Sequence, residues 1–365
     1  MNLMLTVSPK TWIRDQALPL WTTKGFDHSR GMFQESLSML GEPSSAPRRA
    51  MVQARQIYTL RTALERGWAG DSARETALRA AAVLVDRYRQ PSGAIAHAIG
   101  NDGINLNPDL YAQAFAIFGM ASAYALDHQP VWKQAALDVL SFLKRERALP
   151  AGGYSELRAG HPVLEANPHM HLFEAALAWL DVEPAPEWRD LADEIAELAR
   201  TKFVDFESGM LCEFFDQGWS PRRLEGRFVV EPGHQYEWAW LFARYEKLSG
   251  HSASVRVRLC EASDRFGLRD GITIDEIWSD GSVKSASARF WPQSERVKAT
   301  VTEGREKDAR EALQALSAYF ATPTAGMWFD RRDASGRLVE EPIRASGLYH
   351  ILGALSEFDR AYGLP

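Results

Sequence analysis

Apolar residues along most of the chain recur at the three- and four-residue spacing of an amphipathic helix. In segment 46–68, Met51, Ala54, Tyr58 and Ala63 fall near one helical face, and Pro47 stands where a first helical turn tolerates proline. Similar segments predict helices at 10–24, 73–89, 109–127, 130–147, 167–182, 186–203, 234–249, 251–266, 290–302, 306–321 and 343–362. The pattern therefore predicts twelve helices.

A short motif recurs between these helices: a glycine followed by apolar or aromatic residues and often by an acid. Its glycines are spaced 55 to 62 residues apart and are Gly31, Gly93, Gly153, Gly209, Gly271 and Gly326. Even spacing of this kind indicates six units, each with an outer helix, a turn or hairpin that begins at the glycine, and an inner helix. Each helix pair buries its apolar face only against its neighbours, so we expect a closed all-α (α/α)6 barrel with short hairpins in the mouth loops. An open solenoid of helix pairs is the alternative.

Length and composition narrow the class of protein. A chain of 365 residues with 45% hydrophobic residues has a large core, and we expect one catalytic barrel domain over residues 1–365. The net charge of -6 has the wrong sign for a nucleic-acid partner, and no apolar run reaches the ~18 residues that span a membrane. Cys212 and Cys260 lack metal-ligand spacing and suit buried free thiols. We expect a cytoplasmic protein, and we allow for a homodimer.

Polar residues stand near the start of each predicted inner helix. In a closed barrel the loops before these helices surround one mouth, so the side chains should converge there. The candidates are Arg55, Tyr111, Asn167, His171, His234, Glu237, Trp291, Gln293, Glu295, Ser346 and His350. Helical spacing puts several of them on shared faces, since residues three or four apart are neighbours on a helix. The pattern predicts one polar pocket at the mouth.

Structural roles compete with functional ones at several of these positions. Tyr111 and Trp291 suit a core as well as a sugar site, and Glu237 and Glu295 could simply neutralise nearby cations. His169 and His171 have a spacing typical of metal ligands, but residues two apart on a helix point ~200° away from each other. Phosphate-binding glycine signatures are absent from the sequence. We therefore predict no metal site and no cofactor.

The remaining set of histidines, an arginine and carboxylates favours proton-transfer chemistry. Histidine, with an ordinary pKa of ~6.5, is well suited to moving protons at neutral pH. An arginine such as Arg55 can hold the negative charge of an enediolate as it develops. The set suits abstraction of a proton beside a carbonyl group of a small molecule.

Five stretches of the chain resemble the N-acylglucosamine 2-epimerase superfamily, from about residue 25 to the end. They are residues 51–58, 167–175, 231–240, 291–296 and 348–350. The most specific is the string Glu-Pro-Gly-His-Gln-Tyr-Glu-Trp-Ala-Trp at 231–240. The resemblance implies an (α/α)6 barrel, in agreement with the repeat count, and an enzyme that isomerises or epimerises sugars without a cofactor.

The resemblance also implies roles for residues. His234 and His350 would be the acid and base, and four residues would hold the sugar or tune these histidines: Arg55, Asn167, His171 and Glu237. Trp291 and Glu295 would line the site. Gln34 departs from the family, many of whose members carry histidine after the phenylalanine, and this puts substrate choice in doubt.

Our first hypothesis is an aldose–ketose isomerase that converts mannose to fructose, with a sugar 2-epimerase as the alternative because both reactions need similar groups. A glycoside hydrolase using Glu237 and Glu295, or a binding protein without turnover, are the other hypotheses. Arg48 and Arg49 could meet an anionic substituent of the sugar, although adjacent arginines at a helix start are typical of a solvated face.

Overall fold

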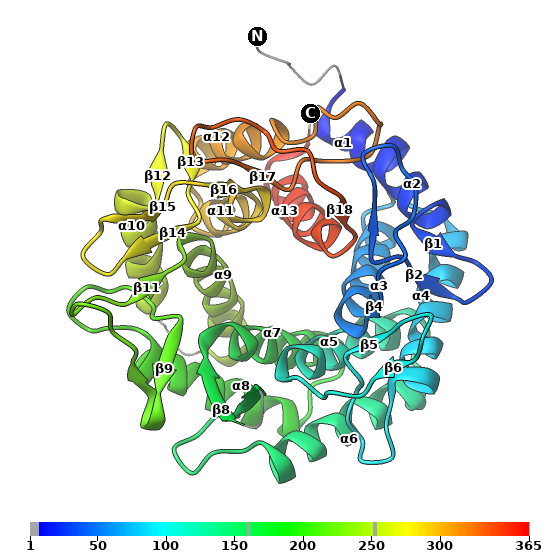
Figure 1. The fold of residues 1–365 in the computed structure, drawn as a ribbon, viewed down its shortest axis with the longest axis horizontal. Coiled ribbons are helices and arrows are strands. Elements are labelled where there is room, and N and C mark those ends of the chain that lie inside the picture. The colour runs from blue at the N-terminus through cyan, green and yellow to red at the C-terminus, as the bar shows by residue number, and fades with distance from the viewer. Residues whose placement is uncertain (1–6, 159–160, 251–253, 365) are drawn as a thin grey trace.

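The computed structural model describes residues 7–158, 161–250 and 254–364, and within these residues its helices form two concentric rings (Figure 1). The inner ring consists of α3 (Ala50–Glu65), α5 (Leu110–Asp127), α7 (Ala166–Val182), α9 (Pro232–Ser249), α11 (Phe290–Thr302) and α13 (Gly347–Tyr362). Each inner helix contacts the next, and α13 contacts α3. The ring is closed, so the (α/α)6 barrel is confirmed and the open solenoid is wrong.

The outer ring covers the inner one. It consists of α4 (Asp71–Val83), α6 (Pro130–Glu146), α8 (Pro186–Leu198), α10 (Val255–Phe266), α12 (Glu306–Ser317) and the continuous run α1 (Pro9–Thr11), Trp12–Ala17 and α2 (Leu18–Thr23). Short π-helical segments, Leu84–Tyr88 and Ala199–Phe203, extend α4 and α8 to the ends that the sequence predicts. Residues 251–253 of the predicted helix 251–266 lie outside the described residues. No helix in the described ranges is both long and apolar enough to cross a membrane.

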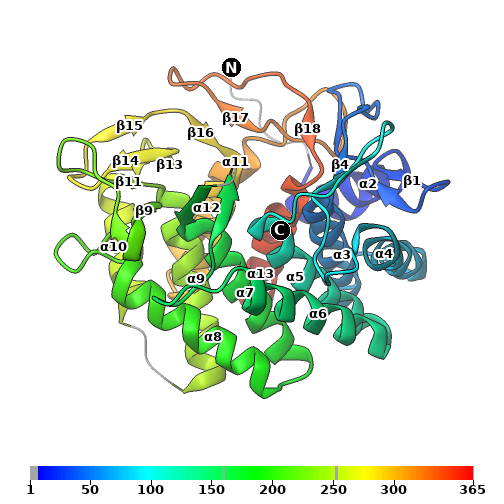
Figure 2. The ribbon, with the colours of Figure 1, turned by 60° about the horizontal axis from the view of Figure 1, so that its bottom comes forward.

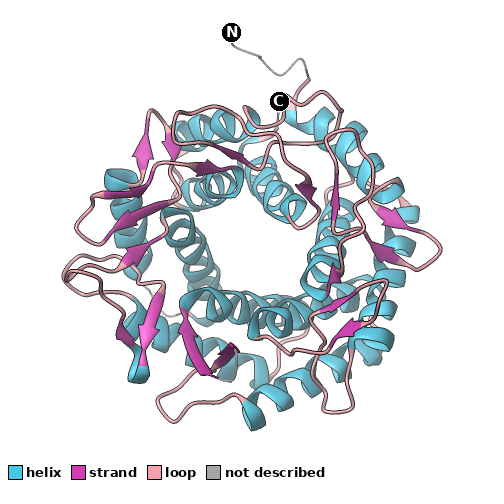
Figure 3. Cartoon of the chain, in the orientation of Figure 1, coloured by secondary structure: helices cyan, strands magenta, loops and turns pink. Residues whose placement is uncertain are grey.

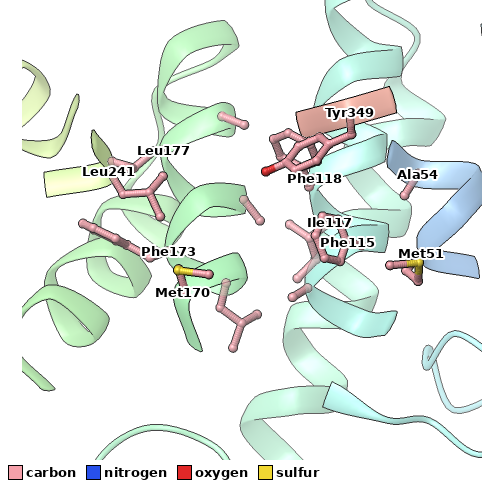
Figure 4. Close-up of a cluster of buried hydrophobic side chains, with 14 of the residues drawn as sticks. Met51, Ala54, Phe115, Ile117, Phe118, Met170, Phe173, Leu177, Leu241 and Tyr349 are labelled. Atoms are coloured by element: carbon pink, nitrogen blue, oxygen red, sulfur yellow. The ribbon is translucent and has the colours of Figure 1, made fainter. Parts of the chain in front are cut away.

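The core lies between neighbouring inner helices and between the two rings. Phe115 and Phe118 of α5 pack edge-on against Tyr349 of α13, with ring centroids 6.0 and 5.9 Å away (Figure 4). A Cβ atom on Gly119 would lie 2.8 Å from Ala54, so this glycine allows α5 to approach α3 closely. Because an inner helix has neighbours on most sides, α5 is apolar nearly all round, as a fully buried helix should be.

Short antiparallel strands gather at one end of the barrel (Figures 2 and 3). They are β1 (Phe26–Asp27), β2 (Met32–Phe33), β3 (Ser36–Leu37), β4 (Arg48–Arg49), β5 (Ala98–Ile99), β6 (Ile104–Asn105), β7 (Glu156–Arg158), β8 (His161–Glu165), β9 (Phe214–Asp216), β10 (Ser220–Pro221), β11 (Val229–Val230), β12 (Leu268–Arg269), β13 (Ile272–Thr273), β14 (Glu276–Trp278), β15 (Val283–Ser285), β16 (Ala288–Arg289), β17 (Arg331–Arg332) and β18 (Ile343–Arg344). Their sheets have two to four strands. Pairing of β18 with β3 joins the last unit to the first.

The six repeated glycines have one backbone conformation in common. Each has a φ between 69° and 90°, the left-handed region that residues with a side chain seldom adopt. Gly326 shows a second reason for glycine, because a Cβ atom there would lie 2.5 Å from the backbone oxygen of Gln16. The repeat is therefore a set of tight turns that only glycine forms without strain.

A repeated hydrogen bond fastens these turns to the inner helices. A glutamine at the fourth residue of four inner helices accepts the N–H of the residue two positions after the motif glycine, at 2.7–3.1 Å. These glutamines are Gln53, Gln113, Gln235 and Gln293. On α7 the same position is His169, whose Nε2 accepts the N–H of Tyr154 while Nδ1 donates to the carbonyl of Glu165. His169 is thus a structural residue at the turn.

Candidate active site

A cavity of about 440 Å³ opens among the strands, where the inner helices begin. It is lined by Arg49, Met51, Arg55, Tyr111, Asn167, His171, Glu231, His234, Glu237, Arg289, Phe290, Trp291, Asp330, Arg331, Glu341, Arg344, Ser346, Gly347 and His350. Nine of the eleven candidates named from the sequence are in this lining. Gln293 is not, because its side chain is bonded to the backbone of Thr273 at the turn. Glu295 is fully buried and contacts His350 from behind, so the expectation that it lines the pocket is wrong.

Arg55 is held in an aromatic enclosure on α3. One of its terminal nitrogens donates to the hydroxyl of Tyr111 at 2.7 Å, and its guanidinium carbon lies 4.2 Å from the ring centroid of Phe115 and 4.9 Å from that of Tyr349. The side chain is only 5% exposed, and its Nε has no hydrogen-bond partner among the described residues. The aromatic rings fix the guanidinium while leaving donors for a bound anion or oxygen.

His234 lies in α9 beside two carboxylates. Its Nδ1 is 3.0 Å from Oε2 of Glu213 and 3.9 Å from Oε2 of Glu231. Burial by itself lowers the pKa of His234, but Glu213 and Glu231 outweigh burial and raise it to about 9. The imidazole is therefore protonated at neutral pH. Because the Nδ1–H of His234 donates a hydrogen bond to Glu213, Nε2 is the ring nitrogen that can contact a ligand.

His350 lies in α13 and is bonded to Glu295 in the same manner, with Nδ1 2.7 Å from Oε1. The other oxygen of Glu295 pairs with the buried amine of Lys298 at 2.5 Å. Burial, together with the positive charges of Arg55 and Lys298, holds the pKa of His350 well below its ordinary value. Burial also raises the pKa of Glu295, which weakens its hold on a proton at His350. His350 is neutral at neutral pH.

The indole of Trp291 lies against both imidazoles. Its ring centroid is 5.0 Å from that of His234 and 5.6 Å from that of His350. An aromatic face in this position suits the C–H face of a sugar. Trp291 therefore places a sugar-sized surface beside two groups of opposite protonation state.

Neutral and acidic groups from α7 and α9 complete the cavity. His171 directs Nδ1 to Glu174 at 3.0 Å, and burial lowers its pKa despite that carboxylate. Glu174 also accepts the hydroxyl of Tyr349. Oδ1 of Asn167 and Oε1 of Glu237 are buried and have no hydrogen-bond partner within the described residues. Such atoms cost free energy unless a ligand or water satisfies them, so they suit substrate hydroxyl groups.

Three groups in the described part of the chain bring potential metal ligands within 4.8 Å of one another. They are His171 with Glu174 and Glu237, Glu213 with Glu231 and His234, and Glu237 with Glu295 and His350. In each group the histidine already gives Nδ1 to a carboxylate of the same group. Lys298 pairs with the same Glu295 that His350 contacts, and Arg289 pairs with Glu231. The donors fit hydrogen-bonded acid–base pairs better than a metal centre, and the absence of a metal stays a prediction.

Glu174, Glu213 and Lys298 contact the site residues directly but were missed from the sequence. Glu213 is the acid of the fourth glycine motif, so the repeat contained its signal. Glu174 and Lys298 stand three residues after His171 and Glu295, a spacing that puts each pair on one helical face. The residues one helical turn below the pocket lie on the same inward face and contact the residues that line it.

Two further expectations concern the strands at the mouth. Gln34 is buried and accepts from Arg48 at 2.8 Å; it is not part of the cavity lining. Arg48 also pairs with Asp27, and Arg49 lines the cavity while bonded to Glu35 at 2.7 Å. The interpretation of Arg48 and Arg49 as a solvated face is wrong, because Arg48 is largely buried and Arg49 lines the cavity, each held by a carboxylate.

Comparisons with known proteins give the family and the fold of the chain. A family profile described as N-acylglucosamine 2-epimerase matches residues 31–354. The chain is 40% identical to a protein named mannose-6-phosphate isomerase from Rhizobium meliloti, over 95% of both chains. It is 23% identical to a protein named D-mannose isomerase from Marinomonas mediterranea, over 75% of this chain and 77% of that one. A crystal structure of a sugar epimerase from a ruminal bacterium superimposes with a TM-score of 0.85 at 18% identity, covering 96% of this chain and 97% of that one, which supports the fold.

Proposed function

The chain belongs to the N-acylglucosamine 2-epimerase family, and on that premise we propose that it is an aldose–ketose isomerase acting on a mannose-type sugar. Family membership makes it an isomerase or epimerase of sugars. Mannose is common to the names of the two relatives described above, one of which is 40% identical over nearly the whole chain. Mannose and fructose differ by one proton-transfer isomerisation, which suits the groups in the cavity.

The observation that carries the proposal is the opposite protonation of His234 and His350, whose ring centroids lie 5.0 and 5.6 Å from that of the Trp291 indole. Two titratable groups whose surroundings push their pKa values apart are suited to act as acid and base. His234 enters the reaction as the acid, because Glu213 and Glu231 keep it charged. His350 enters as the base, because burial, Arg55 and Lys298 keep it neutral.

Ring opening is the first step. His234 gives its Nε2 proton to the ring oxygen as the bond from C1 to that oxygen breaks. The C1 hydroxyl loses its proton to the carboxylate of Glu237, whose Oε1 has no partner among the described residues, and the aldehyde forms. These transfers conserve protons and leave the C2 hydrogen acidified by the new carbonyl group.

Isomerisation follows in the open chain. Neutral His350 removes the C2 proton, and the electron pair of that bond forms the C1–C2 double bond of a cis-enediolate. Arg55 stabilises the negative charge on its oxygens. His350 then returns the proton to C1, and a second proton passes from O2 to O1 through Glu237, whose ligand oxygen lies within 4.8 Å of His350. The product is the 2-ketose.

A 2-epimerase is the second candidate, and the position of Trp291 favours it as well. A neutral base and a charged acid that both lie beside the indole could remove the C2 proton and replace it from the opposite face of the sugar. A hydrolase with Glu237 and Glu295 as its two carboxylates is not supported, because Glu295 does not reach the cavity and is paired with Lys298.

Turnover of mannose in D2O with product analysis by NMR tests the proposal. We expect fructose labelled at C1, together with some direct transfer of the original proton. Aldose labelled at C2 with little ketose would establish the epimerase instead. Absence of both products from mannose and from its 6-phosphate would contradict the assigned sugar.

A further inference from the structure

Four arginines line one side of the cavity mouth, and the reaction described above uses none of them. Arg49 lies in β4, Arg289 in β16, Arg331 in β17 and Arg344 in β18. Figure 1 shows these strands over the starts of α3, α11 and α13, three consecutive inner helices. We call this set the mouth arginines. His350 is in α13, one of these three helices, whereas His234 and Asn167 are in α9 and α7.

The local charge at this mouth differs from that of the whole protein. The chain carries a net charge of -6, yet the cavity lining has five arginines against four carboxylates. The positive ends of α3, α11 and α13 point to the same place, since the inner helices begin at the mouth. The cavity mouth is therefore more positively charged than the protein as a whole.

Strand pairing brings two of the mouth arginines together. Arg289 and Arg331 are directly opposite each other in the antiparallel pair β16–β17. Like charges opposite each other destabilise a sheet. Arg289 is compensated by Glu231 at 2.7 Å and Asp275 at 3.0 Å, whereas the one carboxylate that pairs with Arg331 among the described residues is Glu341, at 3.2 Å. A bound anion would remove the repulsion that remains.

Arg344 is the mouth arginine whose guanidinium has the most hydrogen-bond donors left for a ligand. It is exposed, and in the described ranges no hydrogen bond or ion pair holds its guanidinium. Burial raises the pKa of the neighbouring cavity residue Asp330 to about 6, and the positive charge of Arg344 opposes this shift. A free guanidinium next to a partly compensated one offers the forked donors that bind phosphate oxygens in pairs.

We propose that the mouth arginines, with Arg344 as the anchor, form a subsite for a phosphate monoester on the sugar carbon farthest from the reacting carbons. This inference rests on the proposed function, because C1 and C2 must lie deep in the cavity beside His350, His234 and Arg55. A hexose in that orientation directs its C6 end toward the mouth. The substrate class is then a hexose 6-phosphate, with phosphate as the feature that separates it from the free sugar.

The test compares kcat/KM for mannose 6-phosphate and for mannose with purified protein. The wild type should prefer the phosphate ester by at least about a hundredfold, since several charge-assisted hydrogen bonds are gained. Arg344→Gln should reduce that ratio by about tenfold or more, chiefly through KM. Arg222→Gln is the matched control: Arg222 is exposed, pairs with Asp216 and lies outside the cavity lining, so the ratio should not change.

A ratio near one for the wild type, or equal ratios for Arg344→Gln and Arg222→Gln, would overturn the subsite while leaving the isomerase intact. If neither sugar reacts, the proposed function fails, and calorimetry with mannitol 6-phosphate and mannitol tests the subsite separately. Tighter binding of mannitol 6-phosphate that Arg344→Gln weakens about tenfold supports it. Equal or undetectable binding of the two compounds overturns it.

Discussion

His234 and His350 face the same cavity and are built alike, since each imidazole directs Nδ1 to a buried glutamate. Their pKa values nevertheless move in opposite directions. The pKa values differ because the charged groups around each histidine–glutamate pair differ. The second carboxylate Glu231 stands near His234, whereas Lys298 pairs with the glutamate of His350. The comparison teaches that a histidine–carboxylate pair does not define an acid or a base until the charge behind the carboxylate is known.

Replacing either histidine should have the largest effect. We expect His350→Gln and His234→Gln each to lower kcat by 10²-fold or more, the scale of a positioned acid or base. The effect should fall on kcat rather than KM, because proton transfer occurs in the transition state. Steady-state kinetics measure this, with exposed His28→Gln as the control. Near-normal turnover in both variants would contradict the assigned chemistry.

Lys298→Met should raise the pKa of His350 toward that of His234. Without the amine, Glu295 is no longer compensated and one of the charges that lower the pKa of His350 is gone, so that pKa should rise. Because the base must be neutral, the acid limb of the kcat profile should move to higher pH, so that kcat falls on the acidic side of the profile.

Removing one partner of a buried ion pair is also destabilising. Thermal unfolding of Lys298→Met and of the conservative Lys298→Arg separates the two effects. Arginine should restore the acid limb because it retains the positive charge. An acid limb that does not move in Lys298→Met, in a folded protein, would show that Lys298 is only structural.

Glu213→Gln should lower the pKa of His234. The wild-type rate should decline above about pH 9, where His234 loses its proton. Without the Glu213 charge the pKa of His234 falls, so this alkaline limb should move to lower pH, with a several-fold loss at pH 8. The pH dependence of kcat measures the shift, and exposed Glu225→Gln should leave it unchanged.

The smallest expected effect is on stability. The pKa of His234 is raised in the folded state, so protonation of His234 stabilises the fold fully below its unfolded pKa of ~6.5, and this contribution disappears as the pH rises through about 9. The melting temperatures of the wild type and His234→Gln should therefore differ more at pH 6 than at pH 9.5, by roughly 2 °C. A constant difference at the two pH values would contradict the raised pKa.

Much of the barrel followed from the sequence because its signals are local. The six glycines need a left-handed turn, and helical periodicity is visible within single segments such as 109–127. The ends of the predicted helices differ from the observed ones by a few residues, most at 46–68, where β4 occupies Arg48–Arg49 before α3 begins.

The residues that line the site were easier to predict than the buried residues that contact them. Residues at the first inward turn, such as Arg55 and His234, were found because any inner helix presents that turn to the mouth. Glu295 and Lys298 lie one layer deeper, and only tertiary packing decides which residue touches His350. Arg331 and Arg344 come from a strand-bearing loop without helical periodicity, so no pattern placed them in the cavity. The direction of each histidine pKa likewise depends on groups distant in sequence.

Closure of the ring through β18 and β3 has a consequence for the order of folding. Gln56 of α3 donates to the carbonyl of Ala345, and α13 docks against α3 across nearly three hundred residues of chain. Contacts of such separation form late, because the chain between them must first be organised. A nascent chain that has not yet supplied α13 exposes the apolar flanks of α3 and α11 and lacks His350. The enzyme should therefore gain activity in a single step, when the sixth pair of helices docks, rather than gradually as the earlier pairs assemble.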